Sequence, residues 1–553
     1  MDLEKSYRKI IEKILSGEIG TQDELGLEKR RLSIELGKGG YVRNSEILKY
    51  AKPDERDAVL KILQKKPAKT LSGVAVVSAM TKPFPCPHGK CTYCPGGPDI
   101  AVPQSYTGKE PATRRAIRYG FDPFLQVTFR LAQLKDIGHP IDKAELIVMG
   151  GTLTAQDIDY QDWFVKECLR AMNVFGESYA LIEKLGEEGF IERHGKEKKT
   201  FRYREEIQEE NESAEVRCVG ATFEPRPDWA RRPQIDWMLD LGVTRVETGV
   251  QCPFDFVYKR VNRGHTVEDV AAATAEMKDS GLKVAYHMMP GILGNRPDLD
   301  LHAFRKIFED ERFRPDMLKI YPCLIIKGTE YYDLWKKGEF SPMTTEEAID
   351  LIVKVKKMMP PWVRTMRIMR DIPSNLVEAG IKSSNLGQLV DREMEKRKVL
   401  CKCIRCREVG HMAEKGAIPE EKNIKMKRID YPASGGKEIF LSHEDAKSDI
   451  LLGFLRLRIP YKPFRPEIDN KTSLVRELHV YGPMVEIGEK PQEKWQHRGY
   501  GKELLAEAEK ISAEEFDQKK ILVTSGIGAR EYYRKLGYKK EGAYMCKRMK
   551  SST

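Results

Sequence analysis

Residues 84–97 read FPCPHGKCTYCPGG and place three cysteines, Cys86, Cys91 and Cys94, in a short loop rich in proline and glycine. Three thiols so close together are compatible with a disulfide plus a spare thiol, with a zinc site or with an iron–sulfur cluster. Structural zinc normally has four protein ligands, and His88 inside the loop could complete such a set. The loop alone leaves these alternatives open, and the surrounding sequence has to decide between them.

Strands and helices alternate on both sides of the cysteine loop. The segment GVAVVSAM (73–80) is a predicted strand before it, and one helix is predicted after it within residues 112–138. Further strands are predicted at ELIVMGGT (145–152), EVRCVGATFE (215–224), TRVETGVQ (244–251), KVAYHMMPG (283–291) and MLKIYPC (317–323). Because such alternation is typical of parallel βαβ units, we predict an α/β fold, a complete or partial (β/α) barrel, over residues 73–395. A stretch rich in acids and bases, 183–215, is expected to be an inserted helical or loop excursion.

A glycine pair, Gly150 and Gly151, ends the predicted strand that follows the loop. Glycines at this place allow a backbone to approach the methionyl group of S-adenosylmethionine closely. A [4Fe-4S] cluster held by three cysteines leaves one iron open, and the amino and carboxylate groups of S-adenosylmethionine would chelate that iron. Together with the barrel, these features favour a cluster over zinc or unrelated thiols at Cys86, Cys91 and Cys94.

The composition is that of a globular protein of two or three domains. The chain has 553 residues, of which 41% are hydrophobic and 32% charged. No apolar run approaches the roughly 20 residues that a membrane helix needs, and the acid-rich N-terminus is unlike a secretory signal. We therefore expect a cytoplasmic protein without a membrane partner. In that compartment eleven cysteines indicate metal or redox chemistry more than disulfides.

Basic residues crowd the first 72 residues of a chain whose formal net charge is +11. They include Lys29, Arg30, Arg31, Lys65 and Lys66, and the apolar residues from Tyr7 to Leu15 recur at helical spacing. Two interpretations fit a basic helical segment over 1–72. It is either a docking helix with a solvated basic face or a platform that binds RNA.

The last part of the chain, from residue 429 to 553, has the pattern of a compact α+β domain. Strands are predicted at EIFLS, ILLGFLRLRIP, SLVRELHVYG, ILVTSG and GAYMCKRM, the first three as an antiparallel meander. A Q-x-x-G-x-G motif, Gln496, Gly499 and Gly501, opens a helix together with Tyr500 and Lys502. Free N–H groups at a helix start bind a pyrophosphate, and this order of elements is that of acetyltransferases that bind acetyl-coenzyme A. A plain helix start is the alternative.

Further residues of this domain are expected to contact the coenzyme. In such folds the pantetheine lies along the strand before the glycine motif, here the backbone of Glu477, Leu478, His479 and Val480. In AREYYRKLGY, Tyr532 or Tyr533 could donate a proton to the departing thiolate, because a phenol is protonated at neutral pH. Adjacent helix residues point in different directions, so one of the two tyrosines is expected to be a core residue.

A second cysteine group, CKCIRC, contains Cys401, Cys403 and Cys406. Its density of thiols suggests a structural zinc in a cysteine-rich linker at residues 396–428, between the two larger domains. The fourth ligand is not identifiable, and His411 is merely near. The remaining cysteines are most simply core residues.

Several phrases resemble the catalytic subunit of Elongator in its prokaryotic, stand-alone form. They are CTYCPGGPD (91–99), QSYTGKEPATRRAIR (104–118), DKAELIVMGGT (142–152), VNRGHTVEDV (261–270) and LKIYPCLIIKGTEYY (318–332). The resemblance covers essentially the whole chain and implies a radical S-adenosylmethionine barrel joined to a GNAT acetyltransferase domain. Enzymes of the radical superfamily often have three residues between the first two cysteines, whereas this chain has four.

The resemblance also implies an activity and further site residues. It places Tyr533 near the coenzyme and has Lys143 contact acetyl-coenzyme A, although a surface lysine is the simpler interpretation. The implied reaction cleaves S-adenosylmethionine, forms a radical on the acetyl methyl group and attaches it to C5 of the wobble uridine of a tRNA. Hydrolysis of the thioester then leaves 5-carboxymethyluridine. The anticodon loop of tRNA and an electron donor are the implied partners, and the sequence leaves open whether the chain forms a homodimer.

Two other functions compete with this one. The chain could be a protein lysine acetyltransferase whose cluster domain is only structural, which would need no reductant. It could also be an RNA-binding scaffold without catalysis, although the intact glycine motif and cysteine loop disfavour that function.

Overall fold

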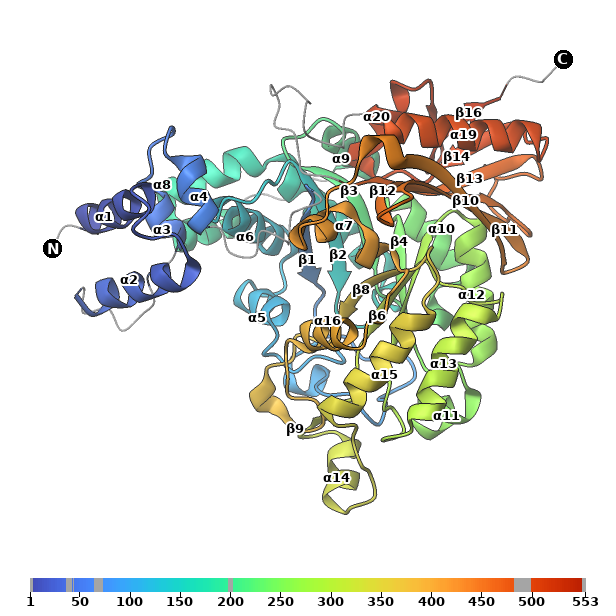
Figure 1. The fold of residues 1–553 in the computed structure, drawn as a ribbon, viewed down its shortest axis with the longest axis horizontal. Coiled ribbons are helices and arrows are strands. Elements are labelled where there is room, and N and C mark those ends of the chain that lie inside the picture. The colour runs from blue at the N-terminus through green and yellow to red at the C-terminus, as the bar shows by residue number, and fades with distance from the viewer. Residues whose placement is uncertain are drawn as a thin grey trace.

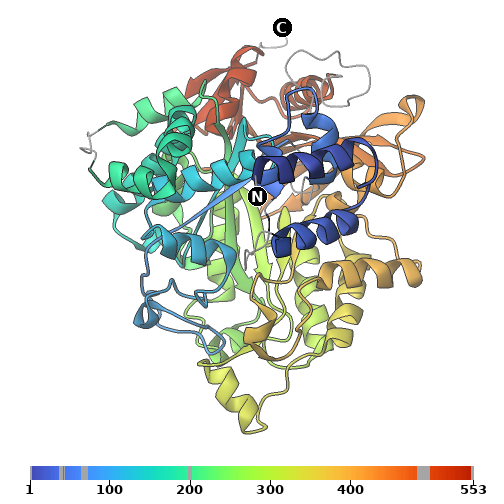
Figure 2. The same cartoon turned by 90° about the vertical axis from the view of Figure 1, so that its left-hand side faces the viewer.

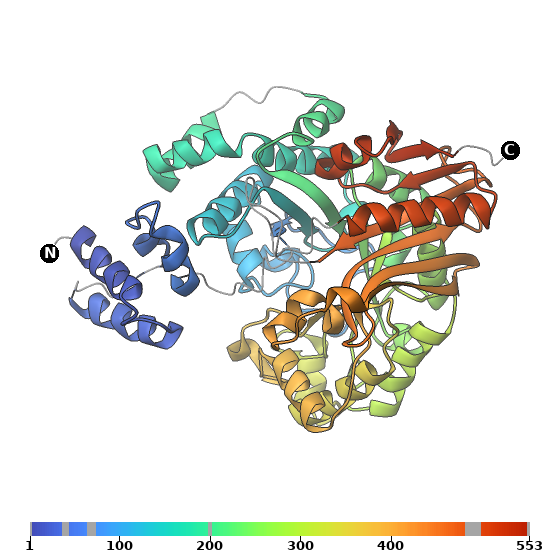
Figure 3. The ribbon, with the colours of Figure 1, turned by 45° about the horizontal axis from the view of Figure 1, so that its top comes forward.

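The computed structural model describes residues 3–35, 42, 44–63, 73–196, 202–481 and 499–549. These residues form a small helical unit at the N-terminus, a large barrel-like domain and a second sheet domain at the C-terminus (Figure 1). The N-terminal unit lies on one side of the barrel, away from the C-terminal sheet (Figures 1 and 3).

Seven parallel strands form the central sheet, in the order β1-β2-β3-β4-β5-β6-β8. They are β1 (Ala75–Met80), β2 (Lys143–Met149), β3 (Arg217–Phe223), β4 (Arg245–Gln251), β5 (Lys283–Met288), β6 (Met317–Ile320) and β8 (Arg364–Ile368). Within the described chain β1 pairs only with β2 and β8 only with β6, so the sheet is an open, partial barrel. The predicted parallel barrel is thus confirmed.

Helices follow the strands and most of them cover the outside of this sheet, whereas α14 projects from one end of the barrel beside β7 (Figure 1). They are α5 (Pro111–Arg118), α6 (Pro123–Asp136), α7 (Ile158–Asn173), α8 (Phe175–Lys196), α9 (Arg204–Asn211), α10 (Arg232–Asp240), α11 (Asp255–Arg260), α12 (Val267–Asp279), α13 (Pro297–Glu309), α14 (Glu330–Lys336), α15 (Thr345–Met358) and α16 (Leu386–Lys396). Two short strands, β7 (Ile325–Ile326) and β9 (Val377–Ala379), form a separate antiparallel pair. Thr266 and Thr344 begin α12 and α15 with capping boxes. The described part of the excursion at 183–215 lies mainly in α8 and α9.

The single helix predicted within residues 112–138 is wrong, because the segment forms two helices. Phe121 has a left-handed backbone, φ +60°, which ends the first helix. Asp122 then caps the second helix by accepting a hydrogen bond of 2.9 Å from the Leu125 amide, and Pro123 occupies the first turn. The Asp-Pro pair therefore starts a new helix instead of continuing the old one.

The C-terminal domain is a seven-stranded sheet in the order β10-β11-β12-β13-β14-β16-β15. Its strands are β10 (Ile424–Ala433), β11 (Gly436–Asp445), β12 (Ile450–Ile459), β13 (Thr472–Val480), β14 (Lys520–Val523), β15 (Lys539–Glu541) and β16 (Tyr544–Arg548). Helix α19 (Tyr500–Glu514) packs across the sheet, and α20 (Arg530–Arg534) follows β14 (Figure 3). Short helices α17 (Ile404–Arg407) and α18 (Val409–Glu414) link the two domains, and the expected boundary at 429 falls inside β10.

The N-terminal unit contains α1 (Leu3–Leu15), α2 (Gln22–Glu35), α3 (Asn44–Leu48) and α4 (Arg56–Leu63), packed around a small core of their own (Figure 2). Contrary to expectation, Lys29 is not a surface cation. Its side chain is 3% exposed, and its ammonium donates a 2.5 Å hydrogen bond to Asn44. Arg30 and Arg31 are exposed, while Lys65 and Lys66 lie outside the described residues. No helix in the described segments is long and apolar enough to cross a membrane.

A buried network of charges joins the barrel to the C-terminal sheet. Arg476 on β13 donates two 2.7 Å hydrogen bonds to Asp316, which immediately precedes β6. Arg458 on β12 pairs with Asp279 at the end of α12, with its shortest contact at 2.6 Å. Glu438 on β11 accepts hydrogen bonds from both arginines. All of these side chains are buried, so Asp279 and Asp316 depend on arginines of the other domain, while Glu438 shares the same two arginines within its own sheet.

Candidate functional site

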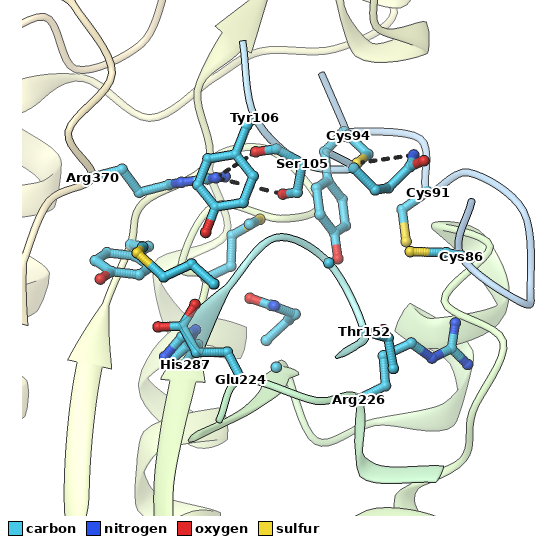
Figure 4. Close-up of a pocket in the computed structure, with 18 of the residues that line it drawn as sticks. Cys86, Cys91, Cys94, Ser105, Tyr106, Thr152, Glu224, Arg226, His287 and Arg370 are labelled. Carbon is cyan, nitrogen blue, oxygen red and sulfur yellow. Dashed lines mark hydrogen bonds between the residues drawn. The ribbon is translucent and has the colours of Figure 1, made fainter. Parts of the chain in front are cut away.

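The cysteine loop lies at the carboxyl end of β1 and borders a cavity of about 190 Å³. Figure 4 shows the cysteines at one side of this cavity and Glu224 and His287 at the other. The lining comes from several strands and the loops that follow them, and it includes Cys86, Cys91, Cys94, Gln104, Gly151, Glu224, Arg226, Glu247, His287 and Arg370. Active sites of barrel enzymes form at this end of the strands, because the loops that follow them converge there.

Two of the three thiols have a hydrogen-bond donor nearby. Gln104 Nε2 lies 3.5 Å from Cys94 Sγ, and Arg263 Nη1 lies 3.7 Å from Cys91 Sγ. Burial, together with the neighbouring thiols Cys94 and Cys91, raises the pKa of Cys86 to about 11. Bound iron would offset this cost by holding the thiolate forms, and N–H donors to the sulfurs tune such clusters. The loop therefore fits an iron–sulfur cluster.

The predicted glycine pair has two different roles. Gly150 has φ +114°, and a Cβ atom there would lie 2.5 Å from the hydroxyl of Thr81, so this glycine allows β1 and β2 to end close together. Gly151, with φ +86°, lines the cavity itself. Of the pair, Gly151 is thus the one that borders the cavity.

Four polar residues, which we call the floor cluster, lie deep in the barrel: Glu224, Glu247, His287 and Lys319. His287 Nε2 is 2.8 Å from Glu247 Oε2, and the Lys319 ammonium contacts Glu247 and lies 3.0 Å from Glu224. Glu224, Glu247 and His287 have the donor set of a metal site. The Lys319 ammonium already supplies the positive charge between the two carboxylates.

The floor cluster is not among the residues that sequence patterns predict. Its members are separated by up to 95 residues, so no spacing motif joins them. The sequence feature that could have indicated these residues is the presence of charged or ionisable side chains in apolar strands. Glu247, His287 and Lys319 stand inside strands whose other residues are largely apolar, VETGV, VAYHM and MLKI. A charge in a strand that is buried on both faces needs a partner or a function.

A column of charged side chains runs from the floor cluster to the C-terminal sheet. Arg245 Nε donates to Glu247 at 3.0 Å and its guanidinium contacts Glu145. Glu477 on β13 lies at the far end, 2.8 Å from Arg456. Burial would raise the pKa of Glu477, but Arg456 and Lys283 hold it below its usual value. The barrel interior and the predicted pantetheine strand are therefore electrostatically connected.

Among the described residues, the expected coenzyme strand has an edge without a neighbouring strand. Strand β13 pairs with β14 only over Thr472–Val475, so the two strands have parted before Glu477, Leu478, His479 and Val480 are reached. On its other side this segment pairs with β12. Burial lowers the pKa of His479 to about 4, and its ring packs against Tyr481 at 4.3 Å. The free edge leaves backbone groups available for a pantetheine chain.

The described part of the glycine motif lies beside this edge. Gly499 caps α19 in a left-handed conformation, φ +90°. A Cβ atom on Gly501 would lie 2.9 Å from the Tyr532 hydroxyl and 3.6 Å from Val480. Tyr500 packs against His443 with ring centroids 4.7 Å apart, and Lys502 is exposed. Gln496 lies outside the described residues.

The two tyrosines of α20 have different environments. Tyr532 is 38% exposed, and its hydroxyl reaches toward Gly501. Tyr533 is 7% exposed and packs within the core of the domain. One tyrosine is thus a core residue, as expected, but the hydroxyl that reaches the glycine motif belongs to Tyr532 and not to Tyr533.

Lys143 lies at the opposite end of β2 from the glycine pair. It begins the strand, whereas Gly150 follows its last residue, which separates the two by about 20 Å along the strand. Its side chain is half-exposed and sits 4.0 Å from Asp142. The neighbouring strand pairs Arg217 with Lys143, and Gly528 of the C-terminal domain packs against Arg217. Lys143 is therefore close to the C-terminal domain and remote from the cysteine loop.

The sulfurs of Cys401, Cys403 and Cys406 lie within 4.8 Å of one another, as three ligands of one ion would. The buried ammonium of Lys356 is 3.0 Å from Cys406 Sγ and 3.5 Å from Cys403 Sγ. His411 instead contacts Glu408 and Glu414. The chemistry of the three thiols fits zinc, and Lys356 would balance part of their negative charge.

Family models match three parts of the chain. The Radical SAM superfamily model matches residues 83–298, the Radical_SAM C-terminal domain matches 315–396 and the ELP3 N-terminal domain matches 3–71.

Relatives that align with nearly the whole chain agree with the family models. The chain is 53% identical over 556 residues to the tRNA uridine(34) acetyltransferase of Methanocaldococcus infernus, covering 99% of this chain and 100% of that protein. It is 40% identical to Elongator complex protein 3 of Homo sapiens, covering 96% and 94% of the two chains. A solved structure, the archaeal Methanocaldococcus infernus Elp3 with an N-terminal deletion, shares 50% identity with a TM-score of 0.72, covering 86% of this chain and all of that one.

Proposed function

The chain belongs to the family of the tRNA uridine(34) acetyltransferases and Elongator complex protein 3, and from this membership we propose that it modifies the wobble uridine of tRNA. The substrates are S-adenosylmethionine, acetyl-coenzyme A and tRNA, and the product is 5-carboxymethyluridine. The membership agrees with the resemblance found in the sequence.

One structural observation carries the proposal. Charges connect the cavity beside the cysteine loop with β13: Arg245 donates to Glu247 of the cavity floor and interacts electrostatically with Glu477 on β13. Acetyl-coenzyme A bound along β13 would therefore lie next to charged side chains that interact with the floor of the cavity. A protein lysine acetyltransferase would have no need to connect its coenzyme strand to a cysteine-lined cavity.

Each part of the chain has a defined task in this reaction. When bound at Cys86, Cys91 and Cys94, the cluster would supply the electron that cleaves S-adenosylmethionine. Gly151 admits the methionyl group, and Arg263 and Gln104 donate hydrogen bonds to the sulfurs. In the C-terminal domain, the start of α19 receives the pyrophosphate and β13 the pantetheine. A zinc ion at Cys401, Cys403 and Cys406 would hold the linker between the domains.

The substrate and the reductant require two more binding partners. The N-terminal unit presents the exposed cations Arg30 and Arg31 to tRNA phosphates. The wobble base lies in a single-stranded loop, so it can unstack and enter the cavity. Reduction of the cluster also requires an external electron donor.

Nucleoside mass spectrometry tests the proposal directly. Reconstituted protein, tRNA, S-adenosylmethionine, acetyl-coenzyme A and dithionite should yield 5-carboxymethyluridine. Omission of any one of these components should abolish the product. Acetylation of protein lysines without a reductant, and an unchanged tRNA, would instead support the lysine acetyltransferase alternative.

A further inference from the structure

We propose that His287, positioned by Glu247, is the general base that hydrolyses the thioester after the acetyl unit has joined the uridine. This inference rests on the proposed function and deepens it. It assigns the last chemical step to the floor cluster of the barrel, instead of to a residue of the acetyltransferase domain.

The covalent geometry of the intermediate requires the hydrolysis to occur near the nucleobase. The carbon that joins the uracil ring is the former methyl carbon of the acetyl group, and it is bonded directly to the thioester carbonyl. When the modified uracil occupies the barrel cavity, the thioester carbonyl therefore lies in the same cavity. The attacking water and its general base must lie there too, because a general base acts at hydrogen-bond distance or through one water.

His287 has the geometry of an oriented base. Its Nε2 is 2.8 Å from a carboxylate oxygen of Glu247, which is fully buried. Burial would raise the pKa of Glu247, but Lys319 and Arg245 hold it well below its usual value. An ionised carboxylate that accepts a hydrogen bond from one imidazole nitrogen leaves the other nitrogen as the proton acceptor.

The other basic groups of the described cavity lining are already engaged. Glu224 lies 3.0 Å from the Lys319 ammonium, and Asp371 pairs with Arg367. Glu110 accepts hydrogen bonds from Thr107 and Thr113. The second imidazole, His88, lies 3.1 Å from Cys91 Sγ, within the cysteine loop. His287 is thus the imidazole of the described lining that has a carboxylate partner and is remote from the cysteines.

The proposed step conserves atoms and electrons. His287 Nδ1 takes a proton from water while the water oxygen attacks the carbonyl carbon. The carbon–sulfur bond then breaks, and the departing thiolate of coenzyme A takes the proton from the imidazolium. Carboxymethyluridine and coenzyme A leave, and the histidine returns to its neutral form without any oxidant or reductant.

The test is to replace His287 and look for the intermediate on the tRNA. His287→Gln should still cleave S-adenosylmethionine but accumulate uridine that carries a coenzyme A thioester, detected by mass spectrometry of nuclease digests. Hydroxylamine should convert this thioester to a hydroxamate. The ratio of acid to thioester should fall about 100-fold or more, the usual contribution of a general base. Glu247→Gln should shift this ratio in the same direction by a smaller factor.

Two controls make the result decisive. His302→Gln changes an exposed histidine outside the cavity and should leave the ratio unchanged. S-adenosylmethionine cleavage by His287→Gln and His287→Asn should match that of the unaltered chain, which shows that the barrel of both variants folds. Carboxymethyluridine formed at the normal rate would overturn the proposal, as would loss of both products while S-adenosylmethionine is still cleaved. Absence of any modified uridine with the unaltered chain would contradict the proposed function itself.

Discussion

Cys86, Cys91 and Cys94 carry a prediction at the scale of single residues. Replacement of all three by alanine should remove the visible absorbance of the reconstituted cluster and abolish tRNA modification, because the thiolates are its protein ligands. Acetyl-coenzyme A binding should remain, since β13 and α19 lie in another domain. Iron analysis and calorimetric titration check the two parts, and full iron content in the triple variant would contradict the assignment.

Lys29 and its neighbours Arg30 and Arg31 are expected to have different roles. Lys29 should stabilise the fold, and the two arginines should bind tRNA. Lys29→Met should destabilise the N-terminal unit by about 1–3 kcal/mol, because Asn44 loses a buried donor. Arg30→Ala with Arg31→Ala should weaken binding of all tRNAs and flatten the salt dependence of log K by about 0.7–0.9 per lost phosphate contact. Filter binding at several salt concentrations would disprove this if affinity and slope stayed unchanged.

At the scale of elements, two substitutions at the start of α19 distinguish the effect of backbone strain on coenzyme binding from the effect of an added charge. Gly499 has φ +90° in open space, so Gly499→Ala adds a left-handed strain of about 1–2 kcal/mol and little else. Gly499→Glu adds a carboxylate where the pyrophosphate should lie. We expect Gly499→Ala to bind acetyl-coenzyme A more weakly than the unaltered chain does, and we expect Gly499→Glu not to bind it at all. Equal affinities of the two variants by calorimetry would show that the pyrophosphate binds elsewhere.

The paired tyrosines of α20 make a second test at this scale. Tyr532→Phe should weaken acetyl-coenzyme A binding or slow its turnover several-fold, because the lost hydroxyl reaches toward Gly501. Tyr533→Phe should change thermal stability more than coenzyme affinity, since that ring belongs to the core. Parallel affinity and melting measurements distinguish the two, and the reverse pattern would restore Tyr533 as the coenzyme residue.

Elements were the scale at which the sequence was most informative. Apolar strands alternating with helices predicted the parallel barrel, because burial on both faces leaves a clear pattern. The break between α5 and α6 was not predicted, although Asp122 followed by Pro123 is a typical sequence signal for the start of a helix. The partnership of His287 with Glu247 could not be predicted, since it depends on how neighbouring strands bring distant residues together. Burial of Lys29 was equally hidden, because a lysine on a helix ordinarily lies in solvent.

At the scale of the whole molecule, Asp316 controls the joint between the domains. Asp316→Asn removes one charge from a fully buried network and should cost about 3–5 kcal/mol of unfolding free energy. Asp517→Asn, at an exposed acid paired with Lys471 and Lys519, should leave the unfolding free energy almost unchanged, because solvent screens such surface pairs. Urea unfolding at neutral pH measures both, and equal costs would show that the network does not stabilise the joint.

The ionisation of Asp316 should also make the free energy of unfolding depend on pH. Burial would raise the pKa of Asp316, but Arg476, Lys278 and Arg456 hold it well below its usual value. Its contribution is therefore complete above the unfolded pKa of about 3.9 and is lost as the pH falls toward the depressed folded value. Unfolding measured below pH 4 should show a shallower loss of stability in Asp316→Asn than in the unaltered chain.

The balanced network also bears on how such a chain could arise or be divided. Cutting the gene between the barrel and the C-terminal sheet would leave Arg458 and Arg476 without Asp279 and Asp316, and the aspartates without the arginines. Glu438 would be left with both arginines in one half and Lys278 with Asp316 in the other, so each half would carry buried charges that are only partly balanced. The two domains are thus poor modules for shuffling, and a lineage that separated them would first have to replace these charges with apolar residues.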